Sequence, residues 1–316
     1  MPAVSYVVTI YNKRPLLPFL LAGLGSQEGE FEREFIFVDD GSTDDSAGLL
    51  KELTSGWRNV TIVSQANAGP APALNVGFRH ASGDFIKPMD GDDLLLPWGT
   101  RRLLEAIETS GCAVAFAPLD KPYDASAPPE EVLAAAGRES GRIERLDDML
   151  RRSLQRAQTN PSAWLARAEA VRASGGCDER VFIQDYSIEL RLAARDCFTL
   201  LHERIAMGPS AAADRLNDNQ AQILHDMNAA LANFITERPD LPRDLRRLAF
   251  CRAAARAWAW ARRHGGKGFR SREFALLCGA RLGLLQTTPE NLHATCTAFA
   301  ETNSIRIPVA GPKRDS

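Results

Sequence analysis

The feature of the sequence that most constrains the fold is a regular alternation of apolar runs and helical stretches across the first 120 residues. The runs are rich in β-branched and aromatic side chains, and the stretches between them have the length and spacing of helices. Strands and helices alternating in this way form βαβ units, because parallel neighbours need a crossover connection. The alternation predicts an α/β fold with a doubly wound, mostly parallel sheet. The expected strands are residues 4–10, 35–38, 60–63, 84–89 and 113–116.

The rest of the chain has a different pattern. After Pro209 the spacing of apolar residues is helical, with little strand signal. A chain of 316 residues is long enough for one large domain with an appendage. We therefore expect a domain of residues 1–210 that carries the sheet and the site, followed by a helical C-terminal region of residues 211–316. Its expected helices are residues 219–234, 241–263, 271–285 and 289–301.

Charge is spread unevenly along the chain. The formal net charge of −2 argues against a general nucleic-acid-binding protein. Residues 1–110 hold nine basic and fifteen acidic side chains, whereas residues 241–281 hold eleven basic and two acidic ones. An acidic part and a basic part in one chain indicate a different partner for each.

The cysteines and the N-terminal residues indicate in which cellular compartment the protein is expected. The six cysteines are scattered without a C-x-x-C pair, as is typical of a reducing compartment, where thiols serve mostly as small apolar side chains. Met1-Pro2-Ala3 does not begin a signal peptide, and the leucine-rich run of residues 16–24 is too short to span a bilayer. We expect a cytoplasmic protein, or one held peripherally at the inner face of a membrane.

Two acidic clusters follow strands of the predicted sheet. Asp39-Asp40-Gly41-Ser42 comes after the second strand, at the sheet edge where such folds bind ligands. An acidic pair there can accept hydrogen bonds from a uracil N–H or a ribose hydroxyl. By itself the cluster also suits a turn followed by a helix cap at Ser42 or Thr43. A phosphoacceptor receiver domain likewise places acidic residues at strand ends, but it lacks a second cluster and so explains less.

The second cluster is Asp90-Gly91-Asp92-Asp93. Three carboxylates in four residues repel one another unless a cation or hydrogen-bond donors compensate them. An Asp-x-Asp pair at a strand end can hold Mg²⁺ or Mn²⁺ through one or two carboxylates and leave the other positions to diphosphate oxygens and water. A solvated acidic turn is the alternative. Two clusters on successive units of one sheet are more specific than either alone.

With these two clusters the chain resembles the family 2 glycosyltransferases, closely over about residues 3–120 and more loosely over 160–200. The resemblance implies a GT-A fold and transfer of a sugar, with inversion, from a nucleoside diphosphate sugar, most readily a UDP-sugar. A glycan or a lipid-linked molecule would be the acceptor, and no nucleic acid is implied. The runs that carry the resemblance are residues 4–12, 25–27, 37–44, 67–71, 75–77 and 81–93.

The resemblance also assigns roles to single residues. Thr9 and Tyr11 would line the nucleotide, and Asp40 together with Asp39 would bind the uracil. The Asp-x-Asp site would be formed by the first and third residues of the second acidic cluster.

In that site Asp92 would ligate a divalent cation, Mn²⁺ or Mg²⁺, directly. Asp90 would contact both the nucleotide and the metal. His225 lies downstream, where some GT-A enzymes supply a histidine as a further metal ligand, although a single histidine on a helix is more often a surface or core residue.

A third stretch, residues 175–193, fits the same family. Members usually open a helix here with Glu-Asp, and the aspartate acts as the base toward the acceptor; this chain has Gln184-Asp185. Asp185 is therefore the expected catalytic base, and Asp178 and Glu179 are the next candidates. A helix N-cap is the alternative role for Asp185, and the two are compatible, because a helix start favours an ionised carboxylate.

The chain departs from the family pattern at two positions that matter. Leu74 stands where many members have arginine near the phosphates, and Gln184 replaces the usual glutamate. These losses leave open a catalytically degenerate, nucleotide-binding scaffold. A nucleotidyltransferase is a second alternative, although residues 11–14 do not form the glycine-rich phosphate loop expected of one. Processive synthases carry Gln-x-x-Arg-Trp and transmembrane helices, which this sequence lacks.

The basic helix of residues 243–263 interleaves arginines with leucine, phenylalanine and tryptophan. Two interpretations stay open. The helix packs against the protein with its arginines in solvent, or it contacts anionic lipid or a lipid-diphosphate acceptor. In the second case Arg246, Arg252 and Arg256 would face the membrane.

Overall fold

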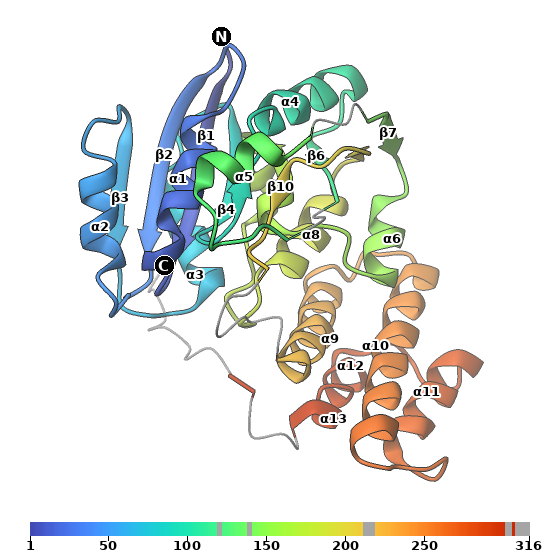
Figure 1. Cartoon of the computed structure of the whole chain (residues 1–316). Coiled ribbons are helices and arrows are strands. Elements are labelled where there is room, and N and C mark those ends of the chain that lie inside the picture. Colours follow the sequence, from blue (N-terminus) through green and yellow to red (C-terminus); the bar gives the residue numbers. More distant parts are fainter. Residues whose placement is uncertain (119–121, 138–140, 211–218, 301–304, 307–316) are drawn as a thin grey trace, which may run out of the picture. The chain divides into compact units, whose positions relative to one another are not determined.

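The computed structural model describes residues 1–118, 122–137, 141–210, 219–300 and 305–306 (Figure 1). The chain forms two compact units. The first contains the described residues of 1–149, 159–177 and 192–213, and the second contains those of 150–158, 178–191 and 214–316. The expected division at residue 210 stays a prediction.

The first unit is built on an eight-stranded sheet in the order β3-β2-β1-β4-β8-β6-β9-β7. β1 pairs in parallel with both β2 and β4, β2 with β3, and β6 with β9, whereas β8 and β7 are antiparallel to their neighbours. A mostly parallel sheet is therefore confirmed. Its strands are β1 Ala3–Ile10, β2 Glu32–Asp39, β3 Val60–Ser64, β4 Phe85–Asp90, β6 Val114–Phe116, β7 Ile143–Leu146, β8 Trp164–Arg167 and β9 Phe198–Leu201.

Helices connect these strands, and β5 Leu94–Leu95 pairs separately with β10 Ala206–Met207. A helix after Ser42 or Thr43 was expected, but it begins at Ser46, because Ser42 and Thr43 hydrogen-bond to Asn12 instead of capping a helix. The helices and 3₁₀ turns up to residue 193 are η1 Arg14–Leu16, α1 Leu17–Gly25, α2 Ser46–Leu53, α3 Pro70–His80, α4 Gly99–Ser110, α5 Pro129–Ala135, α6 Met149–Gln155, η2 Pro161–Ala163, α7 Ala168–Ser174 and α8 Asp185–Ala193.

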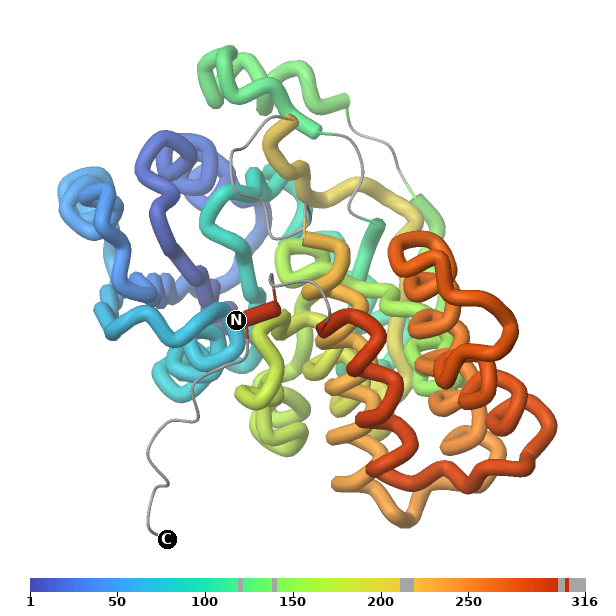
Figure 2. Tube along the Cα trace, turned by 90° about the horizontal axis from the view of Figure 1, so that it is seen from below, coloured from blue at the N-terminus to red at the C-terminus, as the bar shows by residue number. Residues whose placement is uncertain are grey.

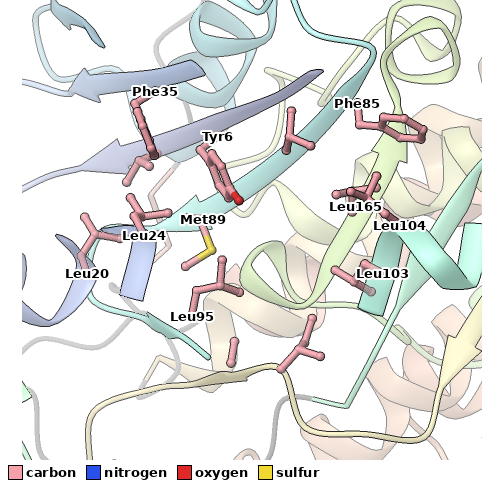
Figure 3. Close-up of a cluster of buried hydrophobic side chains, with 14 of the residues drawn as sticks. Tyr6, Leu20, Leu24, Phe35, Phe85, Met89, Leu95, Leu103, Leu104 and Leu165 are labelled. Carbon is pink, nitrogen blue, oxygen red and sulfur yellow. The ribbon is translucent and has the colours of Figure 1, made fainter. Parts of the chain in front are cut away.

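The main core of this unit lies on one face of the sheet, where side chains of β1, β2 and β4 meet those of α1 and α4 (Figure 3). Tyr6 stacks on Phe35 with ring centroids 5.3 Å apart, and its hydroxyl shares a hydrogen bond of 2.8 Å with Thr100 Oγ1. Each large apolar side chain buried in this way contributes about 1.5–3 kcal/mol. On the other face α3 approaches β1 so closely that a Cβ on Gly77 would lie 2.1 Å from Val7 Cγ1.

Two cysteines differ from the expectation of unpaired thiols. Cys112 and Cys197 form a disulfide. Val114 of β6 pairs with Phe198 of β9 in parallel. Cys112 lies two residues before Val114 and Cys197 directly before Phe198, so this pairing brings the two cysteines to neighbouring positions. The other four cysteines are free, and Cys177 and Cys296 among them are buried, as expected of small apolar side chains.

The helices of the C-terminal region pack together in the second unit (Figures 1 and 2). The helix expected at residues 271–285 ends three residues early, because Gly283 takes a left-handed conformation (φ +73°) and the Leu284 N–H donates to the Gly279 oxygen. No helix in the described ranges is both long and apolar enough to cross a membrane. The helices are α9 Gln220–Glu237, α10 Arg243–His264, α11 Arg272–Leu282, α12 Pro289–Ala294 and α13 Thr297–Ala300.

Candidate active site

The carboxyl ends of three neighbouring strands form one edge of the sheet (Figure 1). β1 lies between β2 and β4, and Ile10 pairs with Asp39 while Thr9 pairs with Asp90. The structure therefore brings the two acidic clusters to either side of the end of β1. This is the edge at which doubly wound sheets bind their ligands.

The segment that leaves β1 links the two loops at this edge. Tyr11 is 44% exposed, so part of this aromatic residue faces solvent. Asn12 has a left-handed conformation (φ 52°), its N–H donates to Ser42 Oγ, and its side-chain oxygen accepts from the Thr43 N–H at 2.7 Å. These bonds hold the exposed Tyr11 beside the loop that follows β2.

The two aspartates at the end of β2 have different surroundings. Asp40 accepts three hydrogen bonds of 2.7–2.9 Å from Gln65 Nε2 and from the N–H groups of Ala68 and Gly69, and so holds the segment before α3. Burial raises the pKa of Asp40 above its usual value against the effect of these donors. Asp39 is also buried and accepts from the Ser42 N–H at 3.2 Å. The geometry thus gives Asp40 a clear structural task beside its expected part in uracil binding.

The second acidic cluster is compensated by two lysines. Lys13 Nζ lies 2.6 Å from Asp92 Oδ2. Asp93 is buried, and burial followed by the charge of Asp92 raises the pKa of Asp93 to about 7. Lys87, within β4, is fully buried, and burial lowers the pKa of Lys87 to about 7, although Asp93 and Asp90 favour its charged form.

A serine joins these groups beneath the turn. Ser162 Oγ accepts from the Asp90 N–H at 2.9 Å and hydrogen-bonds to Asp93. Its main-chain oxygen accepts from Lys87 Nζ at 2.8 Å, and Pro88 oxygen accepts from the same amine at 2.9 Å. The base of the acidic turn is therefore fixed by buried hydrogen bonds, while Asp92 lies at its partly exposed side.

Lys13, Lys87 and Ser162 were not among the expected site residues. Only Lys87 left a signal in the sequence, since a lysine inside an otherwise apolar strand needs buried partners. Lys13 and Ser162 reach the turn from 79 and 72 residues away. Their roles depend on tertiary contacts that local patterns do not report.

The residues of the turn fit a hard divalent cation. Asp90 and Asp92 offer carboxylate oxygens, which Mg²⁺ and Mn²⁺ favour. A Cβ on Gly91 would lie 2.7 Å from the Thr9 oxygen, so glycine lets the turn pass this close to β1. Over the described ranges, three potential ligands from His, Cys, Asp or Glu meet only at Cys112, Asp196 and Cys197, where the thiols form a disulfide.

The acidic turn thus supplies the carboxylates of Asp90 and Asp92, which are too few to fill the coordination sphere of a cation. Such a partial set suits a cation whose remaining ligands are diphosphate oxygens and water. Lys13 Nζ lies against Oδ2 of Asp92, and its positive charge opposes the binding of a second cation there.

In the second unit, Asp185 is the first residue of α8. Gln184 precedes it, and the main-chain oxygen of Gln184 accepts from the Ile188 N–H, so Asp185 lies one position inside the expected N-cap. Burial raises the pKa of Asp185 to about 6, against a hydrogen bond from its own backbone N–H. A helix start was expected to favour the ionised carboxylate, but burial outweighs it. The pKa still leaves Asp185 largely ionised at neutral pH and close to the range of an effective general base.

The segment before α8 is held by a buried aspartate of α9. Asp226 Oδ2 accepts from the N–H groups of Phe182 and Ile183 at 3.0 and 2.9 Å and from Gln222 Nε2 at 2.9 Å. His225 Nδ1 lies 2.8 Å from Asp226 Oδ1. His225 is therefore joined to the residue that positions the entry to α8, and its expected role as a metal ligand stays a prediction.

Asp178, a reserve candidate for the base, is already paired. It is buried, and its carboxylate accepts from Arg180 Nε at 2.7 Å and from Asn233 Nδ2 at 2.7 Å. Burial alone would raise the pKa of Asp178, but these hydrogen bonds lower it below its usual value. A carboxylate held in this state is a weak proton acceptor, which favours Asp185 as the base.

The basic helix α10 is packed more closely than the lipid-contact interpretation requires. Arg256 donates to Asn228 Oδ1 at 2.8 Å, and burial lowers its pKa. Arg246 donates to the Thr287 oxygen at 3.2 Å, whereas Arg252 is exposed. The prediction that these three arginines face a membrane together is therefore wrong for Arg256, which is buried within the unit. For Arg246 and Arg252 it stays a prediction.

A family model described as "Glycosyl transferase family 2" matches residues 5–172, which is more than half of the chain. The chain belongs to glycosyltransferase family 2. The match covers β1 through α7 and so includes both acidic clusters. It ends before α8 and Asp185.

Among sequence relatives, this glycosyltransferase family member is similar to the undecaprenyl-phosphate 4-deoxy-4-formamido-L-arabinose transferase of Klebsiella pneumoniae (strain 342). The two are 35% identical over 106 residues, which are 32% of each chain. The similarity to the corresponding Proteus mirabilis (strain HI4320) transferase is 38% over 93 residues, or 28% of each chain. The chain thus spans about a third of the length of the curated relatives that it matches.

Among solved structures, the chain is similar to Staphylococcus aureus TarS 1-349 in complex with UDP-GlcNAc. The TM-score is 0.65 and the identity 15%, and the match covers 95% of this chain and 92% of that one. At this identity the likeness concerns the fold, and it confirms the GT-A-type α/β architecture with a helical C-terminal region.

The structure shows the surroundings of Leu74 and Gln184, the two residues that depart from the family pattern. Leu74 is buried in α3, where the side chain packs instead of reaching toward a phosphate. Gln184 is buried directly before α8. Neither position carries the charge that many family members have there.

Proposed function

We propose that the chain is an inverting glycosyltransferase that moves a sugar from a UDP-sugar to a hydroxyl of a glycan or lipid-linked acceptor. The observation that carries this proposal is the register of three strand ends, which brings the exposed Tyr11, the Asp39 carboxylate and the Asp-x-Asp turn to one edge of the sheet. The aromatic ring of Tyr11 suits a nucleotide base, and the buried Asp39 carboxylate suits a ribose hydroxyl. The carboxylates of Asp90 and Asp92 suit a metal-bound diphosphate.

The proposed reaction is a single displacement. The acceptor oxygen forms a bond to the anomeric carbon while the bond from that carbon to the diphosphate oxygen breaks, so the configuration inverts. Asp185 takes the proton of the acceptor hydroxyl, a role worth about 10²–10⁴ in rate. Its pKa of about 6 keeps it ionised, and hence basic, at neutral pH.

Asp90 and Asp92 would hold the divalent cation, Mn²⁺ or Mg²⁺, with His225 as a candidate further ligand. When bound, the cation would neutralise charge that develops on the departing diphosphate. Thr9, Tyr11, Asp39, Asp40 and Asp90 would bind the nucleotide.

A lipid-linked acceptor would bring the protein to the inner face of a membrane as a peripheral component, and this is the cellular location that we propose. The Klebsiella relative, whose name refers to undecaprenyl phosphate, supports such an acceptor.

A catalytically inert nucleotide-binding scaffold is the second candidate, and three observations favour it: the buried Leu74, the uncharged Gln184 and the pairing of Lys13 with Asp92. Family membership favours sugar transfer over nucleotidyl transfer.

The test is a panel of nucleotide sugars, each measured with Mn²⁺ for thermal stabilisation and for release of the nucleoside diphosphate. A glycosyltransferase slowly hydrolyses its donor and transfers the sugar when an acceptor is added. Asp185→Asn serves as the matched control, since it should bind donor but not turn it over. A protein that binds UDP and releases none from any UDP-sugar is a scaffold, and the proposal would be rejected.

A further inference from the structure

Large apolar side chains are exposed at one part of the helical C-terminal region. Of the seven that are exposed in the described residues, four lie between residues 269 and 285. Phe269 is 75% exposed, Leu282 70% and Leu284 76%, and Leu285 is exposed to a lesser degree. Isolated exposed leucines are common, whereas these four apolar side chains lie within 17 residues, Phe269 just before α11 and the three leucines at its C-terminal end.

These side chains are held in place by the unit. The Phe269 ring packs edge-on against Phe274 at 5.1 Å and lies 5.9 Å from Trp258 of α10. Leu284 follows the glycine that ends α11, and its N–H is bonded to the Gly279 oxygen. Arg247 of α10 donates to the main-chain oxygen of Arg281 at the same helix end. The apolar side chains therefore project from a fixed scaffold.

The same segment is strongly basic. Residues 262–285 contain six basic side chains and one acidic side chain, and the acidic one, Glu273, is buried and paired with Lys267 at 3.1 Å. The remaining five are exposed arginines. They are Arg262, Arg263, Arg270, Arg272 and Arg281. Exposed cations next to exposed apolar side chains are the composition of a protein surface that lies in the headgroup layer of an anionic bilayer.

We propose that the segment of residues 262–285, the basic-apolar surface, docks the protein onto an anionic lipid bilayer. Its arginines bind lipid phosphates, and Phe269, Leu282 and Leu284 enter the boundary between headgroups and acyl chains. The proposed function includes a peripheral contact with a membrane, and the basic-apolar surface is where we locate it. This location differs from Arg246 and Arg256 of α10, whose side chains hydrogen-bond within the unit. It rests on the proposed function only for the choice of a bilayer as partner.

The test is flotation of the full chain with phosphatidylcholine vesicles, with or without phosphatidylglycerol, in the absence of any sugar donor. We expect binding only to the anionic vesicles and release as salt rises. Leu282→Ser with Leu284→Ser should weaken binding on the order of tenfold. Arg270→Gln with Arg272→Gln should weaken it about fivefold for each charge removed. All these side chains are exposed, so the variants should keep the parent melting temperature.

Two substitutions in the first unit are matched controls: Leu53→Ser, at an exposed leucine of α2, and Arg58→Gln, at an exposed arginine. Both should bind anionic vesicles like the parent. Absence of binding at low salt, or binding that survives both sets of changes in the basic-apolar surface, overturns the proposal. A surface that holds copies of the chain together would give self-association that the leucine changes abolish without any vesicle binding, and this result overturns it as well. Donor hydrolysis, measured separately without vesicles, reports on the proposed function, so the two can fail independently.

Discussion

Lys13 Nζ and Asp92 Oδ2 lie 2.6 Å apart, so the aspartate expected to ligate a metal is paired with a cation of the chain itself. The pair joins the segment after β1 to the turn after β4 and compensates one of three neighbouring carboxylates. The positive charge of Lys13 therefore opposes the binding of a divalent cation at Asp92. The first two predictions concern these two residues.

Lys13→Met should raise the affinity for Mn²⁺ in the absence of nucleotide, because the variant lacks the positive charge beside Asp92. A partly exposed ion pair is worth up to about 1 kcal/mol, so a gain of roughly two- to fivefold is expected. Calorimetric titration with Mn²⁺ measures it. Lys51→Met, at an exposed lysine of α2, should leave the affinity unchanged. A lower or equal affinity in Lys13→Met would show that the lysine does not oppose the binding of the cation.

Asp92→Ala should remove the dependence of UDP binding on metal. In the parent, UDP should bind much more tightly with Mn²⁺ than with EDTA, since the cation links the carboxylate to the diphosphate. In the variant the two affinities should be equal, with an unchanged circular dichroism spectrum. Equal affinities in the parent would contradict the metal assignment.

Asp185→Asn should lower kcat by about 10²-fold or more and leave UDP and metal binding near normal. Asparagine keeps the size of the side chain but is not a base. The pKa of Asp185 is about 6, so the kcat of the parent should fall as the pH decreases through about 6, where the carboxylate becomes protonated. A variant that transfers sugar at the parent rate would reduce Asp185 to a structural residue of α8.

The same substitution makes a prediction about stability. The pKa of Asp185 is higher in the folded chain than its ordinary value of 3.8, so folding favours the protonated form. The ionised carboxylate therefore costs stability, and this cost is complete at pH values above about 6. At pH 8 the Asp185→Asn variant should melt at the same temperature as the parent or higher. A clear drop would mean that the carboxylate makes a stabilising contact.

Asp226→Ala should lower the free energy of unfolding by about 1–3 kcal/mol, because the N–H groups of Phe182 and Ile183 lose their acceptor. Activity should fall further than binding of UDP, since the segment leads into Asp185. Urea unfolding and donor kinetics measure the two effects. Asp240→Ala, at an exposed aspartate, is the control and should change neither.

Cys197→Ser should destabilise the protein only under oxidising conditions. The disulfide to Cys112 spans 85 residues, and in the chain-entropy model closing such a loop is worth about 4–5 kcal/mol. The variant and the parent should melt at the same temperature in excess reductant, and the parent should melt higher without it. Coincident melting in both conditions would indicate that the bond is not formed in solution.

Much of the sheet and of the candidate site followed from the sequence alone. The alternation of strands and helices can be predicted from local sequence, since the spacing of apolar residues within each element indicates its type. The acidic clusters were expected at one sheet edge because parallel strands end on the same side, and the pairing of Ile10 with Asp39 and of Thr9 with Asp90 bears this out.

Only the tertiary structure decided what surrounds those residues. The pairing of Lys13 with Asp92, the disulfide between Cys112 and Cys197 and the contact of Arg256 with Asn228 join parts of the chain 28 to 85 residues apart. The burial that raises the pKa of Asp185 and the exposure of Leu282 and Leu284 likewise depend on which segments lie over each side chain. Local patterns carry no information on such neighbours, because these contacts join residues that are far apart in the sequence.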